Sequence, residues 1–525
     1  MSTKKTSHKI FPFTYRDSIT LMQLASRISA REHIDQAGAV MATEANIALF
    51  LESGMLSGPV DAQPTDLLFV IQGDDENAIN DAVKDFEASL SEKSKSDDGD
   101  EGIEKIQPTS IEMGVEKMPN ANFVVISVPG EFAAAEARKA LNLGLNVMMF
   151  SDNVALEEEI ALKQYAVKRD LIVMGPDCGT AIINSIPLGF ANMVRNGRIG
   201  VVGASGTGVQ QVTSLVHQYG EGISQAIGTG GRDLKEDVGG ISMLQGLQAL
   251  AQDDATKVIV LVSKPPSKNV AEKITEHAQT TGKPVVLNFL GAEVEPVQKG
   301  NVYSAETLEE AARYAVALSK GKAPTKRGYG LEKEIQEKIY TETRKLSEKQ
   351  KYIRGLYSGG TFCYEALIVL SKLVGPVWSN TPVDKRLALR DIWKSSEHTV
   401  VDLGDDYFTR GRPHPMIDLG LRNERILQEA DDPEVAVILF DLVLGYGSHA
   451  DPAKEMVPVV LEARRKAIKT DHHPVFVASV CGTDQDPQNL KRQEEALREA
   501  GVLLAGSNCE AVHIAAEIIN RNKKP

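Results

Sequence analysis

Two short loops of small and hydroxyl-bearing residues have the composition and spacing of anion-binding sites. The first spans residues 203–208, GASGTG, and the second spans residues 358–361, SGGT. Each follows an apolar run typical of a buried strand and precedes a helical apolar periodicity. A helix N-terminus presents unpaired N–H groups and the positive end of the dipole, and glycine lets an anion approach the backbone. Each loop predicts a phosphate or carboxylate site, with a plain tight turn as the alternative.

The strand, loop and helix pattern occurs twice, and Ser205 and Ser358 lie 153 positions apart. Duplication is the economical explanation, and two equivalent units packed about a pseudo-twofold axis would point both loops at one cavity. We therefore expect the loops to face each other and to share one anion. The predicted phosphate contacts are Ser205, Gly206, Thr207, Gly208, Ser358, Gly359, Gly360 and Thr361.

A second predicted site follows three earlier strands. Their exits contain Val128-Pro129, Ser151-Asp152-Asn153 and Gly175-Pro176-Asp177-Cys178. Ligands of parallel sheets bind at the carboxyl ends of strands, so these turns could line a groove for a nucleotide-like ligand such as CoA. A purely structural strand exit is the alternative. For Cys178 we expect a packed thiol, since no base is visible beside it.

A polar stretch, VDLGDDYFTRGRPHP, follows another buried strand at residues 401–415. We assign Arg410 or Arg412 to a substrate carboxylate or phosphate and His414 to proton transfer, against the alternative of a structural ion-pair network. Arg232 is a further catalytic candidate, since Arg232 and Asp233 follow another strand and could reach the same site. Lys264 suits a fixed ammonium near an anion, with a rim salt bridge as the alternative, and His449 is a weaker candidate.

Composition limits the class of protein. The chain has 525 residues, a net charge of -14 and no tract of Lys and Arg, which disfavours nucleic-acid and anionic-membrane partners. The first residues lack a signal-peptide pattern and no run is long and apolar enough for a membrane span, so we expect a cytoplasmic protein. Four scattered cysteines do not have the spacing of a metal site, and we predict no metal.

The elements that position these loops divide the chain into five parts. Residues 1–105 predict a small α/β domain and an acidic linker, 106–196 a Rossmann-like unit, and 197–320 a first flavodoxin-like unit. Residues 321–350 form a charged connector, and 351–525 a second flavodoxin-like unit. The acidic run at 97–101 is expected to be a solvated loop. The fold class is therefore α/β with doubly wound sheets.

Longer motifs give the chain a family resemblance. LGLNVMMFSDNV at 143–154, VMGPDCGT at 173–180, IGTGGRDL at 227–234 and VDLGDDYFTRGRPHPMIDLGLRN at 401–423 resemble the FdrA branch of the succinyl-CoA synthetase superfamily. The turn at 175–178 looks like the GPNC turn of the ligase α subunit, and 203–207 looks like its SRSGT loop. The resemblance covers about 15–520 and implies α-type and partial β-type ligase units in one chain.

Two departures from the ligase pattern bear on function. The sequence has no histidine between His277 and His398, where such ligases carry a phosphohistidine, and it has no room for an ATP-grasp domain. FdrA-like proteins imply instead a subunit of a carbamoyltransferase complex in purine and allantoin catabolism, which uses oxamate or a related ureido acid. Phosphate or carbamoyl phosphate would be a substrate, and other subunits would be partners. A CoA-binding acyl-CoA ligase, or a regulatory remnant of one, is the alternative.

Overall fold

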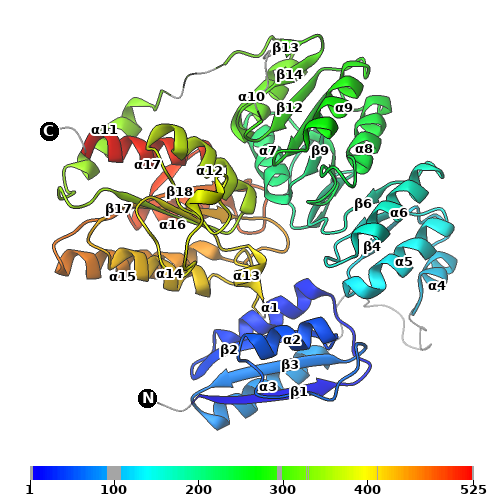
Figure 1. Cartoon of the computed structure of the whole chain (residues 1–525), viewed down its shortest axis with the longest axis horizontal. Helices are drawn as coiled ribbons and strands as arrows, with labels where there is room; N and C mark the ends of the chain where they lie inside the picture. The colour runs from blue at the N-terminus through cyan, green and yellow to red at the C-terminus, as the bar shows by residue number, and fades with distance from the viewer. Residues whose placement is uncertain are drawn as a thin grey trace.

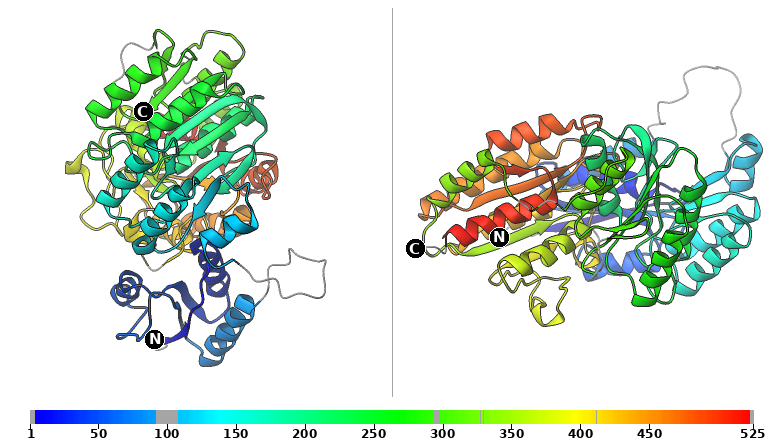
Figure 2. Two further views of the ribbon diagram at one scale, coloured as in Figure 1. Left: turned by 90° about the vertical axis from the view of Figure 1, so that its right-hand side faces the viewer. Right: turned by 90° about the horizontal axis from the view of Figure 1, so that it is seen from above.

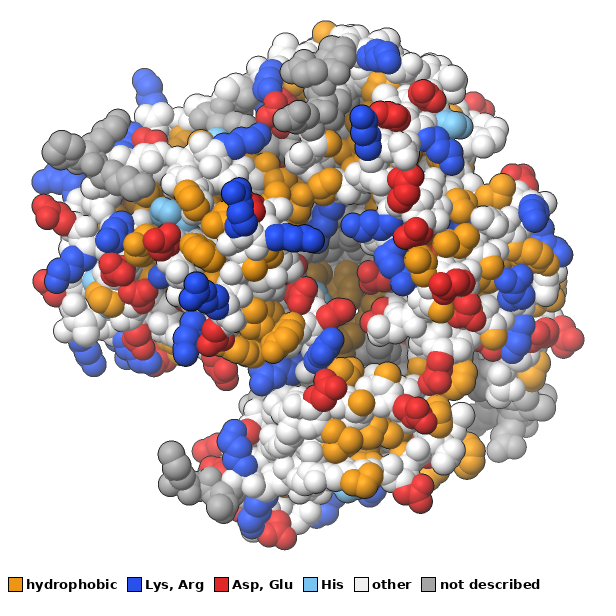
Figure 3. Space-filling view, in the orientation of Figure 1, with side chains coloured by type: hydrophobic (Ala, Val, Ile, Leu, Met, Phe, Trp, Pro, Cys, Tyr) orange, Lys and Arg blue, Asp and Glu red, His pale blue; other side chains and the backbone are white. Residues whose placement is uncertain are grey.

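The computed structural model describes residues 4–91, 108–292, 298–326, 328, 330–410 and 412–522. The acidic run at 97–101 lies outside these residues. The chain forms a small N-terminal α/β domain followed by parallel α/β units, which confirms the expected fold class (Figure 1). In the same orientation, Figure 3 shows a hollow near the centre of the visible face of the molecule, bordered by both basic and acidic side chains.

The N-terminal domain is a three-stranded antiparallel sheet in the order β1-β3-β2. Its strands are β1 (Lys5–Phe11), β2 (Ile34–Met41) and β3 (Leu67–Gly73), and its helices are α1 (Ser18–Ser29), α2 (Glu44–Glu52) and α3 (Glu76–Ser91). Helices α1 and α3 pack on one face of the sheet and α2 on the other. Sequence patterning missed β1 because this edge strand is polar and mostly exposed.

The second unit is a three-stranded parallel sheet in the order β4-β5-β6. It contains α4 (Ile111–Lys117), β4 (Phe123–Ile126), α5 (Gly130–Asn142), β5 (Asn146–Met149), α6 (Leu156–Val167) and β6 (Val173–Met174). The next hairpin, β7 (Thr180–Ile183) and β8 (Ile186–Gly189), pairs with β10 of the following sheet. The sheet of the third unit therefore begins upstream of the expected boundary at 196.

The third unit contains an eight-stranded sheet whose central strands are parallel. Its elements are β9 (Asn196–Ala204), α7 (Gly206–Gln218), β10 (Ile223–Gly228), α8 (Ile241–Gln252), β11 (Val258–Ser263), α9 (Lys268–Gln279), β12 (Val285–Phe289), β13 (Gln298–Lys299), β14 (Val302–Ser304) and α10 (Leu308–Ser319). Apolar strands buried on both faces explain the continuous hydrophobic runs of this region.

The fourth unit is a five-stranded parallel sheet in the order β16-β15-β17-β18-β19. It contains β15 (Tyr352–Tyr357), α12 (Gly360–Leu373), η1 (Lys385–Leu387), β16 (Thr399–Asp402), α13 (Asp406–Thr409), α14 (Gly420–Ala430), β17 (Val435–Val443), α15 (Pro452–Lys469), β18 (Val475–Cys481), α16 (Leu490–Glu499), β19 (Leu503–Ala505) and α17 (Asn508–Asn522). In the connector, α11 (Lys333–Thr343) buries Ile339 in the core and contacts α17 rather than crossing solvent.

The third and fourth units share one topology, as duplication predicts. Numbered along the chain, the five parallel strands of each unit run in the order 2-1-3-4-5, which is the flavodoxin-like order. The first and last helices of each unit, α7 with α10 and α12 with α17, pack into one shared hydrophobic core. Figure 2 shows the third and fourth units side by side when the molecule is seen from above. Since α7 and α12 both follow the first strand of their units, this packing brings their N-termini together.

Candidate functional site

The two small-residue loops meet at the contact between the third and fourth units. Ser205 Oγ lies 2.6 Å from Thr361 Oγ1, and a Cβ at Gly359 would lie 3.1 Å from Cγ2 of Thr207. The expectation that the loops face each other is confirmed. Because one hydroxyl proton is enough for the bond between Ser205 and Thr361, the second hydroxyl proton can be donated to a ligand.

The α7 loop keeps free backbone donors. Ser205 caps the helix by accepting a hydrogen bond from Gly208 N at 3.1 Å. Among the described residues, the amides of Gly206 and Thr207 have no protein acceptor, and Gly206 is exposed. A Cβ at Gly206 would lie 3.2 Å from Thr180 Oγ1, which places β7 beside the loop. This helix N-terminus is therefore open to an anion.

The α12 loop is already partly occupied by a carboxylate of the protein. Asp441 Oδ1 accepts a hydrogen bond from Ser358 N at 2.8 Å, and its Oδ2 accepts hydrogen bonds from Gly359 N and Ser358 Oγ, both at 2.9 Å. The buried Arg422 guanidinium pairs with Asp441 at 3.2 Å. The expected phosphate donors at Ser358 and Gly359 are thus unavailable, because β17 supplies its own anion there.

Lys264 and Asp402 flank the start of α12. A Cβ at Gly360 would lie 2.6 Å from Asp402 Oδ2 and 3.4 Å from Lys264 Nζ. Asp402 is buried, and burial raises the pKa of its carboxyl to about 6 although the nearby Lys264 ammonium lowers it. The exposed Lys264 brings a positive charge to the site, while Asp402 can exchange a proton near neutral pH.

His414 lies beside the α12 loop, but its protonation state does not suit the proton transfer that we expected of it. A Cβ built at Gly404 would lie 2.8 Å from His414 Nε2 and 2.7 Å from the carbonyl oxygen of Ser358. His414 and the α12 loop therefore both border Gly404. Burial lowers the pKa of His414 to about 4, and its Nδ1 accepts a hydrogen bond from Met416 N. His414 is therefore neutral with its proton on Nε2, where it can donate a hydrogen bond but is poorly suited to carry a proton.

The arginines of the same stretch lie elsewhere. Arg410 ends α13 and its guanidinium is 3.8 Å from Glu52 of the N-terminal domain. Arg412 is exposed, and within the described residues no contact joins it to either loop. The structure does not bring these two candidates to the paired loops. The weak candidate His449 pairs with Glu455 at 3.0 Å.

The predicted groove residues do come together at the carboxyl edge of the β4-β5-β6 sheet. Ser151 Oγ donates to Val128 O, Asp177 N donates to Ser151 O, and a Cβ at Gly230 would collide with Pro176 O. The turn at 175–178 thus packs against the glycines of the IGTGGRDL motif. Cys178 is a buried thiol whose pKa is raised to about 12 by burial, which fits a packed thiol.

Acidic groups dominate this groove. Desolvation, with the nearby carboxylates of Asp152 and Asp406, raises the pKa of Asp177 to about 7. Arg232 is held by Val154 O at 2.8 Å and Glu159 at 2.9 Å, while Asp233 is buried and caps α8. These turns offer a diphosphate mainly carboxyl groups, and the Arg232 guanidinium is already paired with Glu159, so these residues do not fit the diphosphate of CoA.

Sequence reasoning missed Asp441, Arg422 and Thr180. Asp441 and Arg422 lie inside apolar or helical patterns, and nothing in their spacing indicates that they meet. A carboxylate in the middle of an otherwise apolar strand such as β17 was the one available signal, because a buried charge needs a partner.

Family models match three parts of the chain. Residues 356–518 match the model described as CoA-ligase, 194–291 match the CoA binding domain, and 2–108 match "AllF, heavy metal-associated domain". The succinate–CoA ligase [ADP-forming] subunit alpha of Staphylococcus epidermidis (strain RP62A) is 27% identical over 183 residues, which are 34% of this chain and 59% of that one. Fold and matches together define an α/β protein that carries a CoA binding domain, a CoA-ligase domain and an AllF-type N-terminal domain.

Within that class, one relative matches nearly end to end. "Uncharacterized protein YahF" of Escherichia coli (strain K12) is 42% identical over 516 residues, which are 98% of this chain and 99% of that one. The chain belongs to the family of YahF. Among solved structures, PH0766 from Pyrococcus horikoshii OT3 is 14% identical with a TM-score of 0.32 and covers 78% of this chain and 86% of that chain.

The donor set of the N-terminal domain does not fit a heavy metal. The cysteines of the sequence are at 178, 363, 481 and 509, all outside residues 2–108. In the part of the chain that the structure describes, no three His, Cys, Asp or Glu side chains are grouped to hold an ion. Soft metals select thiolate and imidazole ligands, and residues 2–108 contain no thiolate and only two imidazoles, those of His8 and His33. No described helix is long and apolar enough to cross a bilayer.

Proposed function

We propose that the paired loops are the site of a carbamoyltransferase subunit, which moves a carbamoyl group between phosphate and a ureido acid, as the FdrA-like motifs imply. The observation that supports this most is the meeting of two helix N-termini at Ser205 and Thr361, 2.6 Å apart, beside Lys264. Such donors stabilise the anions of acyl transfer without a covalent phosphate carrier.

The two loops have different roles in this proposal. The α7 loop, with free amides at Gly206 and Thr207, binds the phosphate together with the Lys264 ammonium. The α12 loop is closed by Asp441 at Ser358 and Gly359, so it contributes the Thr361 hydroxyl and the neighbouring Asp402 carboxyl. Phosphate thus binds mainly to the third unit, with the Thr361 hydroxyl as a donor from the fourth, and proton transfer belongs to the fourth unit.

The reaction is balanced without a further reactant. In the phosphorolytic direction, a phosphate oxygen attacks the ureido carbonyl carbon and forms a tetrahedral oxyanion, which donors at the loops stabilise. The C–N bond then breaks, the leaving nitrogen takes a proton from Asp402, and the proton that the hydrogen phosphate loses on attack returns Asp402 to its protonated form. The products are carbamoyl phosphate and an amide such as oxamate. In the reverse direction Asp402 accepts the proton from the attacking nitrogen.

An acyl-CoA ligase-like function is the second candidate, and the matches to the CoA-ligase and CoA binding domain models favour it. The missing histidine between His277 and His398 counts against the phosphohistidine route of such ligases. Acidic groups at the carboxyl edge of the β4-β5-β6 sheet count against CoA in that groove.

Ligand-dependent melting of the full chain separates these candidates. Phosphate and carbamoyl phosphate should raise the Tm, since ligands that bind the folded state stabilise it, whereas CoA should not. Thr361→Val should weaken the phosphate effect, and Ser110→Ala, which removes the cap of the remote helix α4, should leave it unchanged. A Tm that rises with CoA but not with phosphate would favour the ligase-like function instead.

A pair of matched glycine variants tests the division of roles. The Cβ of Gly206→Ala would lie 3.2 Å from Thr180 Oγ1, which requires a small shift of that side chain, and it would block the free amides. Phosphate affinity measured by calorimetry should therefore fall about tenfold or more. The Cβ of Gly360→Ala would displace the Asp402 carboxyl, so kcat should fall while phosphate affinity changes little. Equal losses of phosphate affinity in both variants would show that the loops bind phosphate symmetrically.

A further inference from the structure

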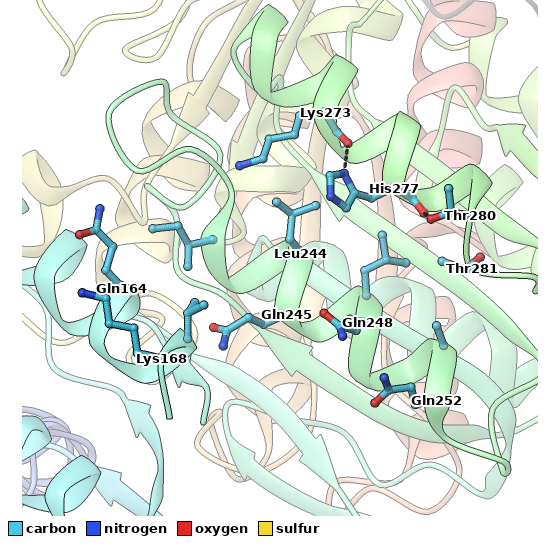
Figure 4. Close-up of a pocket in the computed structure, with 14 residues that line it drawn as sticks. Gln164, Lys168, Leu244, Gln245, Gln248, Gln252, Lys273, His277, Thr280 and Thr281 are labelled. Atoms are coloured by element: carbon cyan, nitrogen blue, oxygen red, sulfur yellow. Dashed lines mark hydrogen bonds between the residues drawn. The ribbon is translucent and has the colours of Figure 1, made fainter. Parts of the chain in front are cut away.

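A groove of about 870 Å³ lies between α6 of the second unit and α8 and α9 of the third. Figure 4 shows α8 along its floor, with Gln164 and Lys168 of α6 on one side and Lys273 and His277 of α9 on the other. None of its lining residues belongs to either of the paired loops.

Helix α8 is unusual for an outer helix of an α/β unit. Its twelve residues, ISMLQGLQALAQ, include no charged side chain, whereas α9 beside it reads KNVAEKITEHAQ. The inner face of α8 packs on the sheet through Met243, Leu247 and Leu250. Beside these residues, the half-buried side chains of Ile241, Leu244 and Ala251 line the groove between glutamines. Solvated helix faces are normally charged, so this neutral outer face is suited to being covered.

Charge defines what would cover it. The groove is lined by Lys168 and Lys273 and by no aspartate or glutamate, in a chain whose net charge is -14. Among the described residues neither lysine forms an ion pair, and Lys273 Nζ reaches only the carbonyl oxygen of Gly239 at 3.4 Å. The groove thus has an apolar floor with an unpaired lysine on each side. A helix with an apolar stripe and acidic side chains on both sides of that stripe would complement it.

We propose that this groove binds an amphipathic helix of a partner subunit, with leucine-like side chains facing α8 and acidic side chains facing Lys168 and Lys273. The twelve residues of α8 extend about 18 Å, which matches roughly three turns of a docked helix. The concave shape favours a single convex helix over the flat face of a second copy. The inference is independent of the proposed carbamoyl chemistry.

Fluorescence anisotropy on the full chain tests the inference with a defined probe. The probe is a labelled amphipathic peptide of four turns with a leucine stripe and glutamate flanks, and its control has lysine flanks. The glutamate-flanked peptide should bind about tenfold more tightly or better. Gln248→Glu, an exposed change on α8, should weaken its binding by a similar factor.

The double variant Lys168→Glu/Lys273→Glu should reverse the preference between the two peptides, while Lys349→Glu, an exposed change on the connector, should not. Unchanged melting curves would confirm that these surface variants fold. The proposal would be overturned if both peptides bind equally tightly, or if Gln248→Glu leaves the affinity for the glutamate-flanked peptide unchanged. Self-association that light scattering detects and Gln248→Glu abolishes would also overturn it, because the occupant would then be a second copy.

Discussion

At the scale of single residues, the candidate site places charged groups of opposite sign close together. Lys264 brings a positive charge to the start of α12, whereas Asp402 and Asp441 place carboxyl groups at the same helix end. Asp441 is neutralised by Arg422, and burial leaves Asp402 with a pKa of about 6. A site that binds phosphate and exchanges a proton needs both kinds of group.

Asp402→Asn tests the proton transfer. In the phosphorolytic direction the protonated carboxyl is the active form, so kcat/KM of the unmodified protein should fall as the pH rises above about 6. The variant should lose this pH dependence and about 10²–10⁴-fold in rate, with phosphate affinity nearly unchanged. A variant with the original pH profile would assign the titration to another group.

At the scale of elements, a buried carboxyl ties the helices of the shared core together. Glu365 of α12 accepts hydrogen bonds from Leu308 N of α10 and Asn508 Nδ2 of α17, both at 2.8 Å. Burial raises its pKa from the ordinary 4.5 to about 7 despite these bonds. The helices that bring the two loops together therefore enclose a group that prefers to be protonated.

This arrangement makes stability depend on pH. The folded state holds a proton on Glu365 that the unfolded state releases near pH 4.5, so the stability present below that pH is lost as the pH rises toward about 7. Glu365→Gln should stabilise the protein by about 1–3 kcal/mol at pH 8 and by much less at pH 5. Urea unfolding at the two pH values measures this, and an equal effect at both would contradict the assigned pKa.

At the scale of the whole molecule, buried charges also join the second and third units. Lys163 of α6 is fully buried and bonds Glu159 at 2.8 Å and Asp233 at 2.7 Å. Asp233 in turn caps α8 through the amides of Ser242 and Met243. Because Lys163 joins α6 of the second unit to the IGTGGRDL motif of the third, the relative position of the two units depends on this network.

Lys163→Met should therefore cost about 3–5 kcal/mol, since it leaves the buried Asp233 carboxylate without a cation and leaves Glu159 with Arg232 alone. Amide exchange should increase most in α6 and at the start of α8. Lys139→Met, which removes an exposed pair with Glu136, is the matched control and should change stability little. Similar losses in both variants would mean that the buried network does not hold the units together.

The sequence by itself determined the elements and their repetition. Apolar runs bounded by glycine turns located the strands of the parallel units, because strands buried on both faces have no other pattern. The recurrence of a strand, a small-residue loop and a helix predicted the duplication and the meeting of the two loops, which the contact between Ser205 and Thr361 confirms. The residue types of a turn and the order of the elements along the chain can be read directly from the sequence.

Only the tertiary structure decided which side chains reach the loops. It places Arg410 against Glu52 and makes His414 neutral, and it brings Asp441 from β17 to the amides of Ser358 and Gly359. Contacts between residues more than eighty positions apart, and the burial that shifts a pKa, depend on how whole units pack. A local pattern holds no information about such packing, so the two equivalent loops of the sequence became chemically different in the fold.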